Sequence, residues 1–151
     1  MNLNGNETTT ETLTLRGRMS ELTQVSLWIE RLASKYAIPQ KTEFAMNLCL
    51  EEVLSNIIRH GYSGDSDHFI SVHFDTHKDD YLVFVVDDHA PPFNPVDAPE
   101  LPPINLLDNI QIGGQGIRLL RRFADTLEYS SIPTGNRLTI GFAASSALAR
   151  D

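Results

Sequence analysis

The stretch EVLSNIIRHGY, residues 52–62, closes the most regular apolar pattern in the chain. From Lys41 to His60 the apolar residues recur on one arc at about 100° per residue, which predicts an amphipathic helix. Glu52, Asn56 and His60 are four residues apart, so they form a polar stripe at the edge of that arc. By itself such a stripe fits either a solvated helix face or a set of groups that points into a site.

The residues before this helix predict a strand and a further helix. Residues 12–15 alternate weakly between apolar and polar, as in an edge strand, and Ser20 is the expected N-cap of a helix that runs to about Tyr36. Its apolar residues recur at three- and four-residue steps and form one stripe that faces a core. They are Leu22, Val25, Ile29, Leu32 and Tyr36.

The residues after the second helix predict four strands. Residues 70–74 alternate between apolar and polar, as in a strand with one buried face, and residues 81–86 are apolar throughout, as in a central strand. Near the C-terminus, residues 127–131 and 137–142 read as strands around a Pro-Thr-Gly-Asn turn at 133–136, which predicts a hairpin.

After the predicted strand at residues 81–86 the pattern of the sequence changes. Residues 90–112 are rich in proline and have no sustained period, which predicts a long loop that is either a functional lid or a disordered segment. The Gly113 to Gly116 cluster then precedes a short amphipathic helix marked by Ile117, Leu120 and Ala124. The whole order predicts an α+β fold, a two-layer sandwich of one mixed or antiparallel sheet with helices on one face.

Composition limits the class of protein. The length of 151 residues suits one domain, and the net charge of −8 argues against nucleic-acid and membrane-surface binding, which depend on basic patches. The N-terminus lacks the features of a signal peptide, and no apolar run approaches the roughly 20 residues that span a bilayer. Cys49 lies inside the apolar helical pattern, so we expect a buried free thiol and a cytoplasmic protein. The expected division is a flexible tail at 1–11, a domain at 12–143 and a second tail at 144–151.

Two further features have residue types suited to a ligand site. Asp88 follows the most apolar strand directly, at a position that either faces a pocket or caps a local turn. The Gly113 to Gly116 cluster before a helix is a candidate phosphate cradle, because glycine lets backbone N–H groups approach an anion that the helix dipole also favours. Each feature alone is weak, and the five histidines offer no zinc-like spacing.

Together the three features resemble the ATPase domain of the Bergerat fold, which gyrase, Hsp90, histidine kinases and MutL share. The resemblance is strongest to the bacterial anti-sigma-factor serine kinases. Residues 52–62 look like the first family box, E-x-x-x-N-x-x-x-H-[AG]-Y, and residues 88–95, DHAPPFNP, look like the second, D-x-G-x-x-F-[DN]-P. Residues 113–125 look like the third, G-G-x-G-[IL]-x-[LI]-[IL]-[RK]. Three boxes in order are specific where each box singly is not.

The resemblance implies a role for each matching residue. Asn56 would hold Mg²⁺, Glu52 would act as the catalytic base toward the attacking hydroxyl, and Asp88 would accept a hydrogen bond from the adenine amine. Residues 90–112 would close as a lid over ATP. The residues expected to bind the nucleotide and its metal are Asn56, His60, Asp88, Ala90, Phe93, Gly113, Gly114, Gln115, Gly116 and Ile117. Ala90 departs from the family, which commonly has glycine there, and we expect this change either to shift the base or sugar slightly or to weaken nucleotide binding.

The resemblance also implies partners. It predicts an ATP-dependent serine/threonine protein kinase and anti-sigma factor, which phosphorylates a serine on a STAS-type antagonist and sequesters a sigma factor or another regulatory protein. It further predicts a homodimer that forms through the region 12–36, where Trp28 either contributes to the interface or widens the buried face. The alternative is a non-catalytic module that binds ATP and sequesters a regulatory protein. Retention of both Glu52 and Asn56 favours the enzyme, because a pure binder needs no base.

Overall fold

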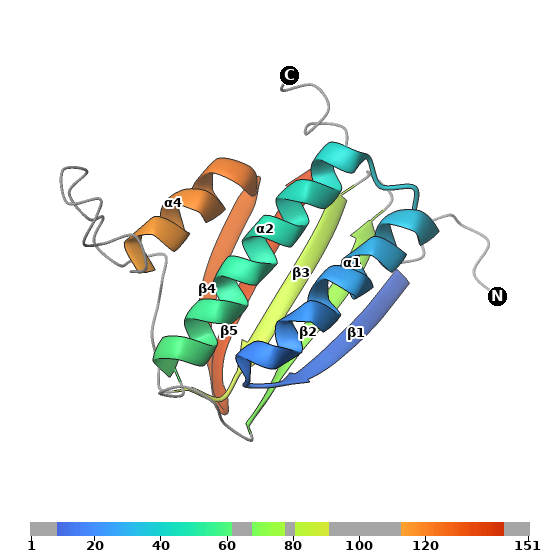
Figure 1. Ribbon diagram of the computed structural model, residues 1–151. Helices are drawn as coiled ribbons and strands as arrows, with labels where there is room; N and C mark the ends of the chain where they lie inside the picture. Colours follow the sequence, from blue (N-terminus) through green and yellow to red (C-terminus); the bar gives the residue numbers. More distant parts are fainter. Residues whose placement is uncertain (1–8, 62–67, 78–80, 91–112, 144–151) are drawn as a thin grey trace.

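The chain folds into one sheet with its helices on a single face (Figure 1). The computed structural model describes residues 9–61, 68–77, 81–90 and 113–143. Every strand pair is antiparallel and the strand order is β1-β2-β3-β5-β4. This architecture confirms the predicted α+β sandwich. The elements are β1 (Thr9–Arg16), the 3-10 helix η1 (Met19–Leu22), α1 (Thr23–Lys35), α2 (Gln40–Asn56), the π-helix η2 (Ile57–Gly61), β2 (Phe69–His77), β3 (Tyr81–Asp88), α4 (Gly113–Phe123), β4 (Thr126–Ile132) and β5 (Gly135–Ala143).

The strands bury alternate residues because successive side chains point to opposite faces of a sheet. In β3, Leu82, Phe84 and Val86 are buried beneath the helices, and the residues between them are half-buried. The apolar run at 81–86 therefore marks a central strand, as predicted, but only one of its faces is fully covered. β1 is an edge strand, as predicted, and it begins at Thr9, three residues before the expected start.

Aromatic side chains join the two layers at the centre of the core. The Phe84 ring lies 5.0 Å from that of Phe74 on β2 and 6.2 Å from that of Phe142 on β5. Trp28 on α1 contacts the same ring edge-on at 5.9 Å and is only 4% exposed. Burial of each such ring contributes about 1.5–3 kcal/mol to folding. Of the two alternatives for Trp28, a part in a dimer interface or a wider buried face, the structure supports the second, since its side chain is covered by the core of its own chain.

The start of the first helix differs from the expectation. Ser20 lies inside η1, and α1 follows with Leu22 at its N-cap position and no side-chain hydrogen bond to the cap. The predicted N-cap at Ser20 is wrong because the preceding turn is held by other groups. The Glu21 N–H donates to the Arg18 carbonyl, and the Glu21 carboxylate accepts from the Arg16 N–H at 3.0 Å.

α2 forms where its apolar arc predicts. Met46, Leu50 and Leu54 are fully buried, and Cys49 beside them is a buried free thiol, as expected. Burial, with a smaller contribution from the charge of Glu52, raises the pKa of the Cys49 thiol to about 12. The helix ends at Asn56 and continues as the π-helix η2, a local widening that is frequent at functional sites.

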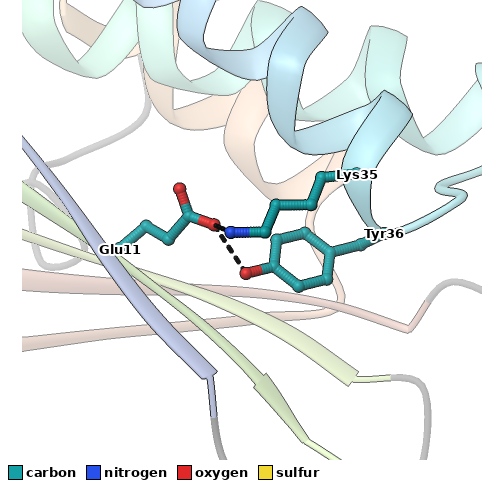
Figure 2. A network of polar contacts seen from close by, with 3 residues as sticks. All are labelled: Glu11, Lys35 and Tyr36. Carbon is teal, nitrogen blue, oxygen red and sulfur yellow. Dashed lines mark hydrogen bonds and ion pairs between the residues drawn. The ribbon is translucent and has the colours of Figure 1, made fainter.

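A polar network ties the edge strand to the end of α1 (Figure 2). Glu11 Oε2 accepts a hydrogen bond from Lys35 Nζ at 2.8 Å and another from the Tyr36 hydroxyl at 2.6 Å. These donors, with Lys35 contributing most, lower the pKa of the Glu11 carboxyl. The Tyr36 ring also packs 5.5 Å from that of Phe74, so the network sits over the margin of the core.

Some sequence predictions fall on residues outside the described ranges. They include nearly all of the expected lid, residues 91–112, and both expected tails except for the part of the first that belongs to β1. Across the ranges that are described, no helix combines the length and apolar character needed to cross a membrane.

Candidate functional site

Two of the three predicted features meet at one end of the molecule. β3 ends at Asp88, β5 begins beside it, and the C-terminal end of α2 lies over the same end of the sheet (Figure 1). The register pairs Asp88 with Asn136 directly across the two strands. Asp88 and Asn56 therefore belong to one region although they are far apart in sequence.

Asp88 is buried, and the hydrogen bonds that it accepts from the described residues all reach one of its two oxygens. Its side chain is 5% exposed, and Oδ1 accepts from the Ala90 N–H at 2.8 Å and from Asn136 Nδ2 at 2.9 Å. Within the described parts of the chain, no donor reaches Oδ2. A carboxylate held in this way keeps one oxygen as an acceptor for a donor group on a ligand.

The surroundings of Asp88 disfavour its charge. Burial raises the pKa of the carboxyl, while the hydrogen bonds from Asn136 and from the Ala90 N–H partly offset that rise. The net direction is upward. A buried carboxyl whose pKa is raised in this way is a candidate functional group.

Gly135 lets β5 start against the end of β3. Its φ is +154°, a conformation that side chains disfavour, and a Cβ at this position would overlap the backbone carbonyl oxygen of Asp88. Only glycine permits this close approach without a shift of the Asp88 backbone. Gly135, the first residue of β5, thus contributes to the position of the carboxylate.

Glu52 and Asn56 interact one helical turn apart on α2. Asn56 Nδ2 donates to Glu52 Oε2 at 3.2 Å, so the amide oxygen of Asn56 points away from the carboxylate. That oxygen is buried and, among the described residues, has no hydrogen-bond partner. Glu52 is half-buried whereas Glu51 is exposed, which agrees with the roughly 100° rotation expected between adjacent helical residues.

The amide oxygen of Asn56 shows whether the residues present suit a bound Mg²⁺ ion. A buried polar atom without a partner is costly, and an oxygen donor of this kind is what Mg²⁺ takes from a protein alongside phosphate and water. Asn56 Oδ1 fits that requirement.

The glycine cluster is placed differently from the prediction. Gly113 and Gly116 lie in the first turn of α4 rather than in a loop before it, because the helix already begins at Gly113. The first N–H groups of a helix have no partner within the helix, so this turn still presents donors and a positive dipole end. α4 packs beside α2, with the ring of Phe123 near its end lying 6.1 Å from that of Phe44 near the start of α2. The N-terminal end of α4 therefore lies toward the half of α2 that carries Asn56.

The other predicted site residues are placed only in part. The Ala90 side chain is buried, and among the described non-glycine residues Ala37 alone has a positive φ. The backbone at Ala90 thus imposes no need for the family's glycine. His60 lies in η2, but its side chain is outside the description, as are Phe93 and the side chains of Gln115 and Ile117.

Sequence reasoning missed two residues of this region, Asn136 and Tyr129. Asn136 Nδ2 donates to Asp88 Oδ1 and, at 3.2 Å, to the Ala90 carbonyl, and the Tyr129 hydroxyl donates to Asn136 Oδ1. Asn136 was part of the predicted turn at 133–136, whose composition carries no sign of a site. Its role depends on the pairing of β3 with β5, which local patterns do not reveal.

Comparison with known proteins agrees with this geometry. The family description "Histidine kinase-like ATPase domain" matches residues 15–142 of the chain. Among curated proteins, the serine/threonine-protein kinase BtrW of Bordetella bronchiseptica is 29% identical over 132 residues, which make up 87% of this chain and 92% of that protein. The family match indicates an ATP-binding domain, and the name of the relative describes a protein kinase.

Solved structures share the fold. The RsbU and RsbW domains of Rv1364c from Mycobacterium tuberculosis match with a TM-score of 0.64 at 13% identity, over 88% of this chain and 32% of that chain. The histidine kinase domain of the EL346 blue-light activated histidine kinase from Erythrobacter litoralis matches with a TM-score of 0.56 at 17% identity, over 86% of this chain and 62% of that chain. The chain thus spans less than two thirds of either solved chain.

Proposed function

The chain belongs to the histidine kinase-like ATPase domain family, and from that premise we propose that it transfers the γ-phosphoryl group of ATP to a serine on a partner protein. The observation that carries this proposal is the arrangement of Glu52 and Asn56. A half-buried carboxylate is hydrogen-bonded to an amide whose oxygen is orphaned and buried. A domain that only binds ATP has no need for an oriented base next to a metal ligand.

Each group has a distinct role in this proposal. Glu52 accepts the proton of the attacking serine hydroxyl, and its hydrogen bond from Asn56 keeps the carboxylate turned toward that position. Bound Mg²⁺ would neutralise charge on the phosphates, with Asn56 Oδ1 as its ligand from the protein. The first turn of α4 offers backbone N–H groups to the phosphates.

Asp88 recognises the base in the proposed complex. Its Oδ2 accepts a hydrogen bond from the exocyclic amine of adenine, while Oδ1 stays bonded to Ala90 and Asn136. The stability lost by burying this carboxylate is offset when the amine pairs with it. The same Asp88 oxygen would face the carbonyl of guanine unfavourably, so the site selects ATP.

We also infer the partners from the family resemblance and from the named relatives. The acceptor serine belongs to a STAS-type antagonist, and the chain sequesters a sigma factor or another regulatory protein in the cytoplasm. Two copies pair through the β1 and α1 side, where β1 is one of the two edge strands of the sheet. Since Trp28 is buried, the contacts come from exposed residues there, such as Leu27, which is 56% exposed.

A matched pair of variants tests phosphoryl transfer. The protein is incubated with γ-labelled ATP and a candidate STAS protein, and single-turnover rates are measured for the wild type, Glu52→Gln and Glu51→Gln. Glu52→Gln should bind ATP with little change but lose at least about 100-fold in rate, the usual contribution of a general base. Glu51→Gln should keep the wild-type rate, because Glu51 is exposed on another face of α2.

The reverse pattern, or equal rates in all three proteins, would contradict the role given to Glu52. Tight ATP binding by a wild type that transfers no phosphate to any STAS protein would favour the non-catalytic module instead. In that case the nucleotide site stands and the kinase proposal fails.

A further inference from the structure

Asp88 sits at the end of a hydrogen-bonded chain that crosses three strands. The Tyr129 hydroxyl on β4 donates to Asn136 Oδ1 on β5, and Asn136 Nδ2 donates to Asp88 Oδ1 on β3. Asn136 and Asp88 are 6% and 5% exposed, so the links between them are shielded from water. Buried polar groups that are joined in this way stiffen one another.

The hydrogen bonds from Tyr129 through Asn136 to Asp88 allow only one orientation of the Asn136 amide. Its Nδ2 faces two acceptors, Asp88 Oδ1 at 2.9 Å and the Ala90 carbonyl at 3.2 Å, whereas its Oδ1 faces the Tyr129 hydroxyl. A flipped amide would set an oxygen against both acceptors. Since an amide orientation follows from its hydrogen-bond partners, the Tyr129 hydroxyl and the two acceptors select the same one.

This orientation determines what Asp88 can bind. Asn136 and the Ala90 N–H together occupy Oδ1, which leaves Oδ2 to accept from a ligand. A carboxylate without those two donors could rotate and present either oxygen at several angles. We propose that Asn136 and Tyr129 are positioning residues, which hold Asp88 at the angle that selects a nucleobase carrying an exocyclic amine.

The inference deepens the proposed function and rests on the nucleotide site described there. It adds that base selectivity is set by a pair of residues outside the three sequence boxes. Neither residue contacts the base in this scheme. Tyr129 acts on the ligand only through Asn136, and Asn136 acts only through Asp88.

Removal of the Tyr129 hydroxyl tests whether Tyr129 and Asn136 position Asp88. Kd values for ATP and for purine riboside triphosphate, which lacks the exocyclic amine, are measured by calorimetry for the wild type and Tyr129→Phe. The variant should lose about threefold to tenfold in ATP affinity, the usual worth of one hydrogen bond, while the affinity for the analogue stays nearly constant. The Kd for the analogue divided by the Kd for ATP, which measures the preference for ATP, should therefore fall. Tyr81→Phe is the matched control, because it removes a hydroxyl bonded to Thr126 Oγ1 at 2.7 Å on the same sheet.

A double-mutant cycle tests whether Tyr129 acts through Asn136. Asn136→Ala should reduce the same ratio, and adding Tyr129→Phe to that variant should change it no further. Additive effects would overturn the relay, as would equal losses for both ligands, which indicate general destabilisation. A wild type that prefers ATP with an unchanged ratio in Tyr129→Phe would sink the positioning role alone. A wild type that binds neither nucleotide would sink the proposed function and this inference together.

Discussion

Replacing Asp88 with asparagine changes one atom of the side chain, and the structure predicts where that change falls. Oδ1 accepts from both the Ala90 N–H and Asn136 Nδ2, so the amide oxygen of the variant must keep that position. The amide NH₂ group is then forced into the place of Oδ2. In the proposed complex this sets a donor against the amine of adenine, which is also a donor.

The cost follows from this mispairing. The complex loses one hydrogen bond to a charged acceptor and gains a donor facing a donor in a site that is 5% exposed. Such a mismatch costs about 1–3 kcal/mol. This corresponds to a Kd for ATP that is about 5- to 150-fold higher than that of the wild type.

Calorimetry with ATP and Mg²⁺ measures this change, and Asp87→Asn is the matched control. Asp87 precedes Asp88 on β3 but pairs with Arg137 on the open face of the sheet, Nε to Oδ1 at 2.8 Å and Nη2 to Oδ2 at 2.9 Å. Because that ion pair is exposed, its loss should cost at most about 1 kcal/mol of stability and leave ATP affinity unchanged. Equal ATP affinity in Asp88→Asn and the wild type would refute the assigned contact.

The stability of the ligand-free variant gives an independent check. A carboxyl whose folded-state pKa is raised contributes stability below its unfolded pKa and loses it as pH rises through the folded value. Burial raises the pKa of Asp88, so its charge opposes folding at neutral pH. Asp88→Asn should therefore unfold at no lower temperature than the wild type at pH 7, with a smaller difference near pH 4. A variant that is strongly destabilised at pH 7 would show that the carboxylate supports the fold itself.

Two further predictions concern the surroundings of the site. Gly135→Ala should lower the free energy of unfolding by about 1–3 kcal/mol, because a Cβ with φ at +154° would overlap the Asp88 carbonyl, and denaturant titration measures it. Gly141→Ala should cost less, since Gly141 does not have a positive φ and its Cβ would meet side-chain atoms of Thr126 and Tyr81 rather than backbone, and equal losses would contradict the argument. Cys49, whose pKa is raised to about 12 by burial and by the charge of Glu52, should not react with a thiol reagent at pH 8 until denaturant is added. Rapid labelling of the folded protein would show that α2 opens readily.

Local patterns in the sequence determined the elements and most of the core. The arc on α2 and the alternation in β2 follow from the periods of helix and strand, so residues such as Leu50 and Phe74 were predictable as buried. They also placed Glu52 and Asn56 on one face of a helix. The start of α1 was not predictable in this way, because contacts of Glu21 with Arg16 and Arg18 replaced the expected cap at Ser20.

The tertiary structure alone decided how the site is held. Sequence patterns marked Asp88 as a candidate, yet they could not show the difference between its two oxygens, of which Oδ1 accepts both hydrogen bonds given by the described residues. That difference depends on Asn136, which is 48 residues away in sequence and lies directly opposite Asp88 only because β5 pairs with β3. The burial of Trp28 likewise depends on the ring of Phe84. Periodicity is a property of neighbouring residues, whereas the partners of a buried polar or aromatic group are set by strand order and register, which residues distant in sequence determine together.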